Sequence, residues 1–170
     1  GLAERFIALA QAAIADHGRF HVALSGGSTP RQLYETLAGG SFRDRLDWSH
    51  VELYFGDERC VPPEHEYSNY QMAQQALLGH VPVSDAQVHR MQGELPPQEA
   101  AQAYAELLAQ RLPQSDGQPR FVERLKVQLL AGGRLEMNAA VLFDRDRAQH
   151  GPGQVDRIGG LRNLQARGVR

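Results

Sequence analysis

A short apolar run that leads into a glycine-rich turn and a proline-initiated helix constrains this fold more than any other feature. The run from Phe20 to Leu24 fits a buried strand, and residues 25–29 read Ser-Gly-Gly-Ser-Thr. Pro30 follows, where proline suits the first turn of a helix, and helical spacing continues through Leu33, Tyr34 and Leu37. The segment therefore predicts a strand, a loop and a helix in succession.

Strands alternate with helices along most of the chain. Residues 51–55 alternate in polarity and predict a second strand, which ends at Gly56. Apolar spacing predicts helices over three further ranges, residues 2–16, 68–78 and 98–112. Gly18 follows the first of these and fits a left-handed cap. The alternation predicts an α/β fold, a Rossmann-like parallel sheet with helices on both faces, incomplete at its C-terminal end.

The charge of the chain argues against a polymeric ligand. With 18 basic and 20 acidic residues the formal net charge is −2, so nothing attracts nucleic acid or an anionic membrane globally. No run approaches the roughly 18 apolar residues of a membrane span. The 170 residues, 42% of them hydrophobic, suit a single domain. We expect the partner to be a small molecule held by a local site, with no nucleic acid and no membrane.

Cysteine and histidine usage gives no sign of a metal centre. Cys60 is the only cysteine, so neither an intramolecular disulfide nor a thiolate cluster can form, which is compatible with a reducing cytoplasm. The seven histidines are scattered without the spacing of metal ligands. We expect a cytoplasmic protein without a metal. His65 alone lies close in sequence to a candidate site. An exposed loop residue is the favoured interpretation of His65, and a functional residue is the less favoured one.

The glycine-rich loop is the first candidate site, a phosphate cradle. A turn between a strand and a helix exposes backbone N–H groups and a positive helix end to an anion. In the loop from Ser25 to Thr29, Gly26 and Gly27 permit close approach of the backbone, while Ser28 and Thr29 add hydroxyl donors. The loop is neither a Walker loop nor a G-x-G-x-x-G fingerprint, so a nucleotide is not favoured. An ordinary Gly-Gly turn with a Ser or Thr cap explains the same residues equally well.

Asp57-Glu58-Arg59 is the second candidate site. It follows the second predicted strand and should therefore lie at the same edge of the sheet as the first loop. Arg59 can fork onto a carboxylate, a phosphate or a developing oxyanion, and Asp57 can orient it or bind sugar hydroxyls. Taken alone, a solvated charged turn is the more frequent explanation. Ser68 and Asn69 open the next helix and can face the same cleft, although Ser68-x-x-Gln71 also fits a capping box, the commoner role for such a serine.

Together these segments resemble the 6-phosphogluconolactonases of the glucosamine/galactosamine-6-phosphate isomerase superfamily. The resemblance rests on residues 22–30, Trp48 before a strand, residues 56–62 and residues 67–69, in this order and spacing, and it covers about residues 1 to 121. It implies hydrolysis of 6-phospho-D-glucono-1,5-lactone to 6-phosphogluconate without a cofactor. By resemblance the first loop, with Ser68 and Asn69, binds the sugar phosphate, and Asp57 and Arg59 lie by the lactone.

Two other functions stay open beside lactone hydrolysis. The related glucosamine-6-phosphate deaminases share a similar loop but typically carry Asp-Glu-Tyr where this chain has Arg59 as the third residue, which favours the lactonase. The other alternative is a catalytically silent protein that binds a sugar phosphate. Neither the oligomeric state nor the exact substrate follows from the sequence.

The sequence departs from the lactonase pattern after Phe121. Lactonases normally continue with an apolar strand, a glycine-rich turn and an Asp-Gly-His-Thr signature whose histidine is the base, and this chain contains no such signature. Residues 122–126 and 138–143 resemble pieces of a later family segment. We therefore expect a lactonase-like domain over residues 1–143 with an internal deletion, an atypical tail over residues 144–170 that is loop-like or disordered, and an impaired activity. A reading-frame change or gene-model error is our hypothesis for the tail.

Overall fold

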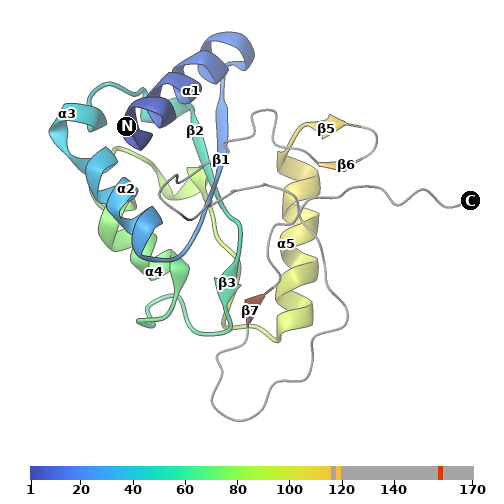
Figure 1. The fold of residues 1–170 in the computed structure, drawn as a ribbon. Helices are drawn as coiled ribbons and strands as arrows, with labels where there is room; N and C mark the ends of the chain where they lie inside the picture. Colours follow the sequence, from blue (N-terminus) through green and yellow to red (C-terminus); the bar gives the residue numbers. More distant parts are fainter. Residues whose placement is uncertain (116–117, 120–156, 159–170) are drawn as a thin grey trace, which may run out of the picture.

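The computed structural model describes residues 1–115, 118–119 and 157–158, and Figure 1 shows their arrangement. The helices and strands follow one another in the order α1 (Leu2–His17), β1 (Phe20–Leu24), α2 (Ser28–Ala38), α3 (Gly40–Arg43), η1 (Trp48–His50), β2 (Val51–Phe55), β3 (Glu58–Arg59), α4 (Asn69–Ala73), η2 (Gln74–Leu78), η3 (Asp85–Gln87), β4 (Val88–His89), α5 (Pro97–Arg111), β5 (Gln114–Ser115), β6 (Gln118–Pro119) and β7 (Arg157–Ile158). Up to α5 the chain alternates strands with helices, as the apolar spacing predicts.

Three parallel strands form the main sheet, in the order β1-β2-β4. β1 and β2 pair along their whole length, from Phe20 opposite Val51 to Leu24 opposite Phe55. β4 pairs with β2 only near its carboxyl end, where His89 lies opposite Tyr54. Because the strands run in one direction, the loops that follow them leave the sheet at one edge. The predicted parallel sheet is confirmed.

Helices cover both faces of this sheet (Figure 1). Val22 and Leu53 belong to the larger apolar core, which includes residues of α1, α2, α4 and η2. Ala23 and Tyr54, one position further along each strand, pack instead with residues of α5 such as Tyr104. Neighbouring strand residues point to opposite faces, so burial on both faces explains the nearly continuous apolar runs in the sequence. The predicted Rossmann-like layering is confirmed.

The helix ends largely follow their sequence signals. α1 ends at His17, and Gly18 has a φ of 76° and donates its N–H to the carbonyl of Ile14 at 2.9 Å. α2 carries Pro30 in its first turn, and α5 begins at Pro97. The expected helix over residues 68–78 is regular only as far as Ala73. It continues as η2, a π-helical turn.

η2 differs from the expected α-helix because its turn is wider. The N–H of Gly79 donates to the carbonyl oxygen of Gln74 at 3.0 Å, five residues earlier. Three consecutive apolar residues, Ala76, Leu77 and Leu78, are all buried. The wide turn lets all three reach the core, which a regular helical turn of 100° per residue does less easily.

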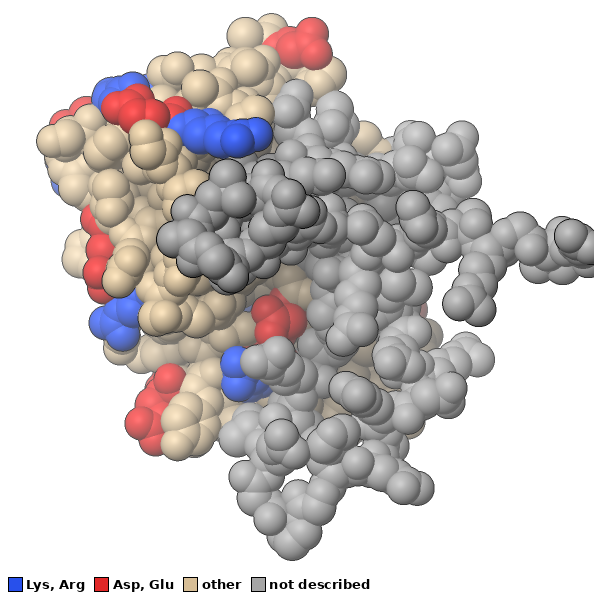
Figure 2. Space-filling view, in the orientation of Figure 1, with Lys and Arg blue, Asp and Glu red and all other residues tan. Residues whose placement is uncertain are grey.

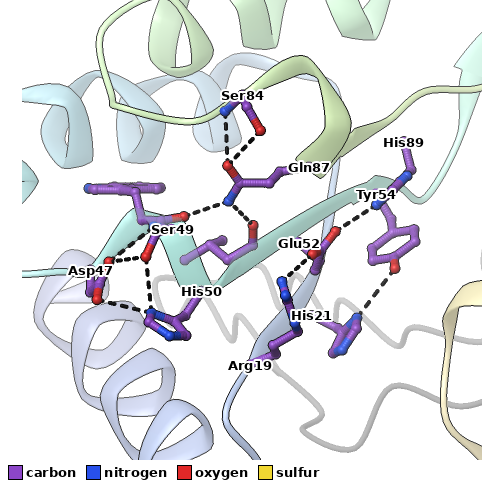
Figure 3. Close-up of polar contacts among 12 residues, drawn as sticks. Arg19, His21, Asp47, Ser49, His50, Glu52, Tyr54, Ser84, Gln87 and His89 are labelled. Carbon is purple, nitrogen blue, oxygen red and sulfur yellow. Dashed lines mark hydrogen bonds and ion pairs between the residues drawn. The ribbon is translucent and has the colours of Figure 1, made fainter.

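The five two-residue strands, β3 to β7, were not expected from the sequence. β4 has only two residues, too few for an alternating pattern to show. The side-chain amide of Gln87, just before it, fixes its position by donating to the carbonyls of Trp48 and Val51 at 2.7 and 2.8 Å (Figure 3). β3 lies within the charged triplet that the sequence suggested to be a loop, and it pairs antiparallel with β7.

The expectations for the end of the chain fall mostly outside the described residues. The proposed deletion after Phe121 and the domain boundary at residue 143 lie among residues 120–156, and most of the tail from residue 144 is also outside the described part. Within that tail, Arg157–Ile158 form β7 where a loop was expected, because they pair with β3. The deletion and the domain boundaries therefore stay predictions.

The described surface mixes charges of both signs. On the face shown in Figure 2, acidic and basic side chains lie close together and no large patch of one sign appears on the coloured part. Several of them form exposed ion pairs, such as Arg45 with Glu4 and Arg31 with Glu35. Among the described helices, none combines the length and apolar character that crossing a bilayer requires.

Five polar side chains form a connected cluster where β1, β2 and β4 lie side by side (Figure 3). Arg19 donates to Glu52 at 2.6 Å, and the other carboxylate oxygen of Glu52 lies 2.7 Å from Nε2 of His89. Nδ1 of His21 lies 3.3 Å from the Tyr54 hydroxyl. The ring of Tyr54 stacks between those of His21 and His89, with centroid distances of 5.9 and 4.6 Å. The cluster places titratable groups in a partly buried setting.

We expect the protein to lose stability in mild acid through His21. Burial lowers the pKa of His21 below 6.5; Glu52 opposes this shift, while Arg19 and His89 add to it. The unfolded chain then takes up this proton at a higher pH than the folded chain, so the free energy of unfolding falls as pH drops from about 6.5 toward the folded pKa. Urea unfolding at about pH 7.5 and pH 5.5 measures the loss, and His21→Asn, which does not titrate, should reduce it.

The control for this prediction is His17→Asn. His17 is an exposed histidine at the end of α1, outside the cluster, so its replacement should leave the contribution of His21 in place. If wild type and His21→Asn lose the same free energy of unfolding between the two pH values, burial of the His21 ring does not produce the effect.

Candidate functional site

The loop after β1 is anchored to α2 by a buried tyrosine. The hydroxyl of Tyr34 accepts a hydrogen bond from the N–H of Ser25 at 2.8 Å and donates to the Ser25 carbonyl at 3.0 Å. Burial raises the pKa of Tyr34 well above its usual range, so the hydroxyl keeps the proton that it donates. Both backbone groups of Ser25 are engaged, and this residue has only its side chain left for a ligand.

The remainder of the loop exposes backbone at the start of α2. Gly27 has a φ of 110°, a backbone conformation that residues other than glycine rarely adopt. No side chain of the described residues caps the first turn of α2. Gly27 and Ser28 are exposed, and Thr29 is half-buried. The uncapped N–H groups and the helix dipole make this end of α2 suited to an anion, and phosphate binding here stays a prediction.

The loop after β2 begins beside the first one. The N–H of Gly56 donates to the carbonyl of Leu24 at 2.8 Å, so pairing of β1 and β2 continues to the edge of the sheet. The hydroxyl of Tyr104, on α5, accepts from the N–H of Phe55 at 2.8 Å. It shares its one proton between the carbonyls of Phe55 and His89, at 3.2 and 3.1 Å. One buried hydroxyl therefore holds the carboxyl ends of β2 and β4 together.

Asn69 joins the two candidate loops. Its side-chain nitrogen donates to the carbonyl of Asp57 at 2.9 Å. The same amide lies against the Cα of Gly26 so closely that a Cβ there would overlap it. Asn69 is itself buried, with 5% of its surface exposed. The glycine-rich loop and the Asp57–Arg59 segment meet at the carboxyl edge of the sheet, which confirms the predicted convergence.

Glu58 is the buried member of the charged triplet, with 2% of its surface exposed. One carboxylate oxygen accepts from the N–H groups of Arg59 and Asn69, both at 2.7 Å. The other accepts from the N–H of Tyr70 at 2.9 Å and from the Ser68 hydroxyl at 3.2 Å. This carboxylate satisfies the first N–H groups of α4, so it ties the triplet to the start of that helix.

Arg59 carries an unsatisfied donor. Among the buried side-chain nitrogen and oxygen atoms of the described residues, its Nε is the one for which no hydrogen-bond partner is found. Such atoms are rare in folded proteins because an unpaired buried donor is unfavourable. Its backbone is held, because its N–H donates to Glu58 and its carbonyl lies against Gly93, where a Cβ would overlap it. The arginine is therefore fixed at the main chain while its guanidinium retains an unused donor.

The other predicted residues have mixed outcomes. Asp57 is half-buried at the junction of the loops. Ser68 is buried, donates to Glu58 and accepts from the N–H of Gln71 at 3.2 Å, which is the expected capping contact. The structure does not test whether Ser68 or Asn69 also touches a ligand. His65 accepts from the N–H of Tyr67 at 3.1 Å within its own turn, so it is a loop residue as expected, but it is half-buried and not exposed.

Sequence reasoning missed four residues that shape this edge. In the sequence, Glu58 belongs to a triplet that fits a solvated turn, Tyr34 fits the helical spacing after Pro30, and Tyr104 lies within the helix predicted over residues 98–112. Arg90 was not considered, yet it directly follows β4; it pairs with Glu94 through two contacts of 2.9 and 2.6 Å. A signal for β4 was present, since the stretch between the predicted helices, residues 79–97, is long for a structureless connection in a compact domain.

The described residues contain no group of three or more His, Cys, Asp or Glu side chains arranged to hold a metal ion. Four kinds of group already named lie at the two loops. These are backbone N–H groups at the start of α2, hydroxyls of the loop, the half-buried carboxylate of Asp57 and the guanidinium of Arg59.

The order of these loops along one sheet edge agrees with a comparison against known families. Residues 1–134 match the family described as glucosamine-6-phosphate isomerases/6-phosphogluconolactonase. The chain belongs to this family. The match extends beyond residue 121, where the resemblance was expected to end.

Individual members of the glucosamine-6-phosphate isomerase/6-phosphogluconolactonase family show how much of a whole relative this chain represents. It is 43% identical over 100 residues to a 6-phosphogluconolactonase of Treponema pallidum, an alignment that covers 59% of this chain and 41% of that protein. The solved structure of a devB protein superposes with a TM-score of 0.65 at 32% identity, covering 71% of this chain and 50% of the other. The chain thus spans about half the length of its relatives, or less.

A glucosamine-6-phosphate deaminase shares the architecture only. Its structure, described as monomeric, superposes with a TM-score of 0.56 at 14% identity over 64% of this chain and 46% of that one. At this identity the likeness shows the fold and carries no information about the reaction.

Proposed function

We propose that this chain carries the N-terminal part of a 6-phosphogluconolactonase site and acts on 6-phospho-D-glucono-1,5-lactone in the oxidative pentose phosphate pathway. In the reaction, water adds to the lactone carbonyl, the ring C–O bond breaks, and 6-phosphogluconate results without a cofactor. The observation that carries the proposal is the Asn69 bridge, which joins the glycine-rich loop to the Asp57–Arg59 segment. A sugar whose phosphate binds at one loop can therefore contact the other loop with its ring.

The roles we propose follow the chemistry of each group. The sugar phosphate binds at the start of α2, contacting the N–H groups of Gly26 and Gly27 and the hydroxyls of Ser25, Ser28 and Thr29. Arg59 directs its unused donor to the carbonyl oxygen on which negative charge develops. Asp57 orients the arginine or accepts from a sugar hydroxyl. Ser68 and Asn69 form the border of the site. They contact the sugar with the hydrogen-bonding capacity that their contacts within the protein leave.

A second candidate function is binding of a sugar phosphate without turnover. It is favoured by one observation, the lack of an Asp-Gly-His-Thr signature in this sequence, because that segment supplies the base in complete lactonases by resemblance. We therefore propose that turnover by this chain is impaired while ligand binding at the N-terminal loops persists. Between the enzymatic alternatives, product analysis decides, since a lactonase releases acid and a deaminase releases ammonia.

The proposed substrate also favours a location. A phosphorylated sugar carries charge that strongly disfavours passage through a bilayer, so it stays in the compartment where it is made. We propose that this compartment is the cytoplasm, in agreement with the use of a single cysteine.

We expect the product 6-phosphogluconate to bind weakly and through both loops. Gly27→Val should abolish this binding, because a side chain at a φ of 110° both strains the loop and fills the space where backbone must approach the phosphate. Arg59→Ala should weaken it by about tenfold, since a hydrogen bond to a charged group is lost. Calorimetry or ligand-observed NMR measures both effects.

Gly18→Val is the control for backbone strain. Gly18 also has a positive φ, 76°, but it lies at the end of α1 with open space around it. It should lower stability through strain and leave 6-phosphogluconate binding unchanged wherever the protein is folded. If Gly27→Val binds as well as the unmutated chain, the start of α2 is not the phosphate site.

A further inference from the structure

We infer that Glu58 is a positioning residue of this site. It holds the backbone of Asp57 and Arg59 so that their side chains reach a bound sugar. The inference rests on the proposed function and extends it, because no substrate contact or role was assigned to this carboxylate. The argument uses three observations: the burial of Glu58, its four donors, and the chain of contacts from it to both loops.

Glu58 lies in a buried socket that is formed by its four hydrogen-bond donors. Its side chain is 2% exposed, and each carboxylate oxygen accepts two hydrogen bonds. Three of the four donors are backbone N–H groups, which cannot turn away as a side chain can. A carboxylate is the group that fits, because it has acceptors only. An uncompensated carboxylate is strongly disfavoured in such burial, so the socket and the residue depend on each other.

The contacts of Glu58 extend to both ends of the candidate site. Its bond from the N–H of Arg59 fixes the backbone from which the guanidinium departs. Its bond from the N–H of Asn69 fixes the backbone of the residue whose amide holds the Asp57 carbonyl and lies against Gly26. Glu58 itself faces the start of α4, and both of its carboxylate oxygens are used by donors of the protein. It therefore acts by positioning other residues and not by touching the substrate.

Glu58→Gln changes this socket with almost no change of shape. Whichever way the new amide turns, its NH₂ group faces either the N–H groups of Arg59 and Asn69 or the N–H of Tyr70 and the Ser68 hydroxyl. Donor then opposes donor on one side, and the backbone there must shift. A small displacement of groups that must meet a ligand in a fixed geometry strongly weakens their contacts. We therefore expect 6-phosphogluconate to bind about tenfold more weakly.

Inorganic phosphate provides the readout that a merely structural role would not move. On the proposed function it binds only at the start of α2. Two bonds from Tyr34 hold Ser25 there, so a shift at Glu58 disturbs this loop only through the contact of Asn69 with Gly26. Glu58→Gln should therefore keep phosphate affinity within about twofold while 6-phosphogluconate affinity falls. Glu4→Gln, in which the exposed partner of Arg45 receives the same chemical change, should alter neither.

A gentler second variant guards against a loss of folding. Glu58→Asp keeps a carboxylate but is shorter by one methylene, so it weakens the four bonds without placing donor against donor and should show the same selective loss. All affinities are measured by NMR titration at a temperature at which circular dichroism shows the variant folded.

The outcomes separate the inference from the proposed function. If the unmutated chain binds neither 6-phosphogluconate nor phosphate, the proposed function fails, and this inference with it. If the unmutated chain binds both and the two variants bind 6-phosphogluconate as it does, or lose both ligands equally, Glu58 does not position the sugar end and only this inference is overturned.

Discussion

Gly26→Ala should destabilise this protein by roughly 2–4 kcal/mol, although it adds a single methyl group to a half-buried loop. The new Cβ would overlap the side-chain amide of Asn69, which is buried and bonded to the Asp57 carbonyl. Either the amide leaves and its hydrogen bond is lost, or the loop after β1 moves away from the sheet edge. Urea unfolding followed by circular dichroism measures the change in the free energy of unfolding.

A double substitution isolates the cause of that loss. In Gly26→Ala combined with Asn69→Ala the overlapping atoms are absent, so adding the methyl to Asn69→Ala should change the free energy of unfolding by less than about 1 kcal/mol. Gly40→Ala is the positional control, because Gly40 has open space around it and no positive φ. If the methyl at residue 26 costs the same with and without the asparagine side chain, the two loops are not in the contact that we describe.

Lactone hydrolysis should rise by about 10²- to 10⁴-fold when a segment with the Asp-Gly-His-Thr signature is restored to this chain. General-base assistance is worth about that much, and the signature histidine supplies it by resemblance. Among the described residues, the histidine nearest in sequence to the site is His65, whose Nδ1 accepts a hydrogen bond within its own turn. Following loss of the lactone rapidly, with the spontaneous opening subtracted, gives the two rates.

The control for this experiment is the same restored chain with its signature histidine replaced by glutamine. It should fold like the restored chain and fall back toward the rate of the unmodified one, which separates the base from any gain in stability. Equal rates for the unmodified chain and the restored chain would show that this histidine is not needed, and that Asp57 and Arg59 suffice for the reaction.

Local signals in the sequence were enough for the architecture of the sheet. The run from Phe20 to Leu24 reads as apolar because both faces of β1 are covered, and this pattern is visible without coordinates. Pro30 and Gly18 act through their own backbone preferences, so the starts and ends they predict need no tertiary partner. The convergence of the two loops follows from parallel strands alone.

The tertiary structure decided which residues hold the loops together. β4 is two residues long, and its place depends on pairing with β2 and on the amide of Gln87, contacts that lie 30 or more residues apart in sequence. Glu58 looks like any solvated acid in the sequence, because two of its three N–H donors, those of Asn69 and Tyr70, come from the start of a helix 11 and 12 residues later. Tyr34 and Tyr104 likewise reveal their role only where their hydroxyls meet strand ends. Short-range patterns record which face of an element is apolar, whereas the partner of a buried polar group is fixed by how the elements pack.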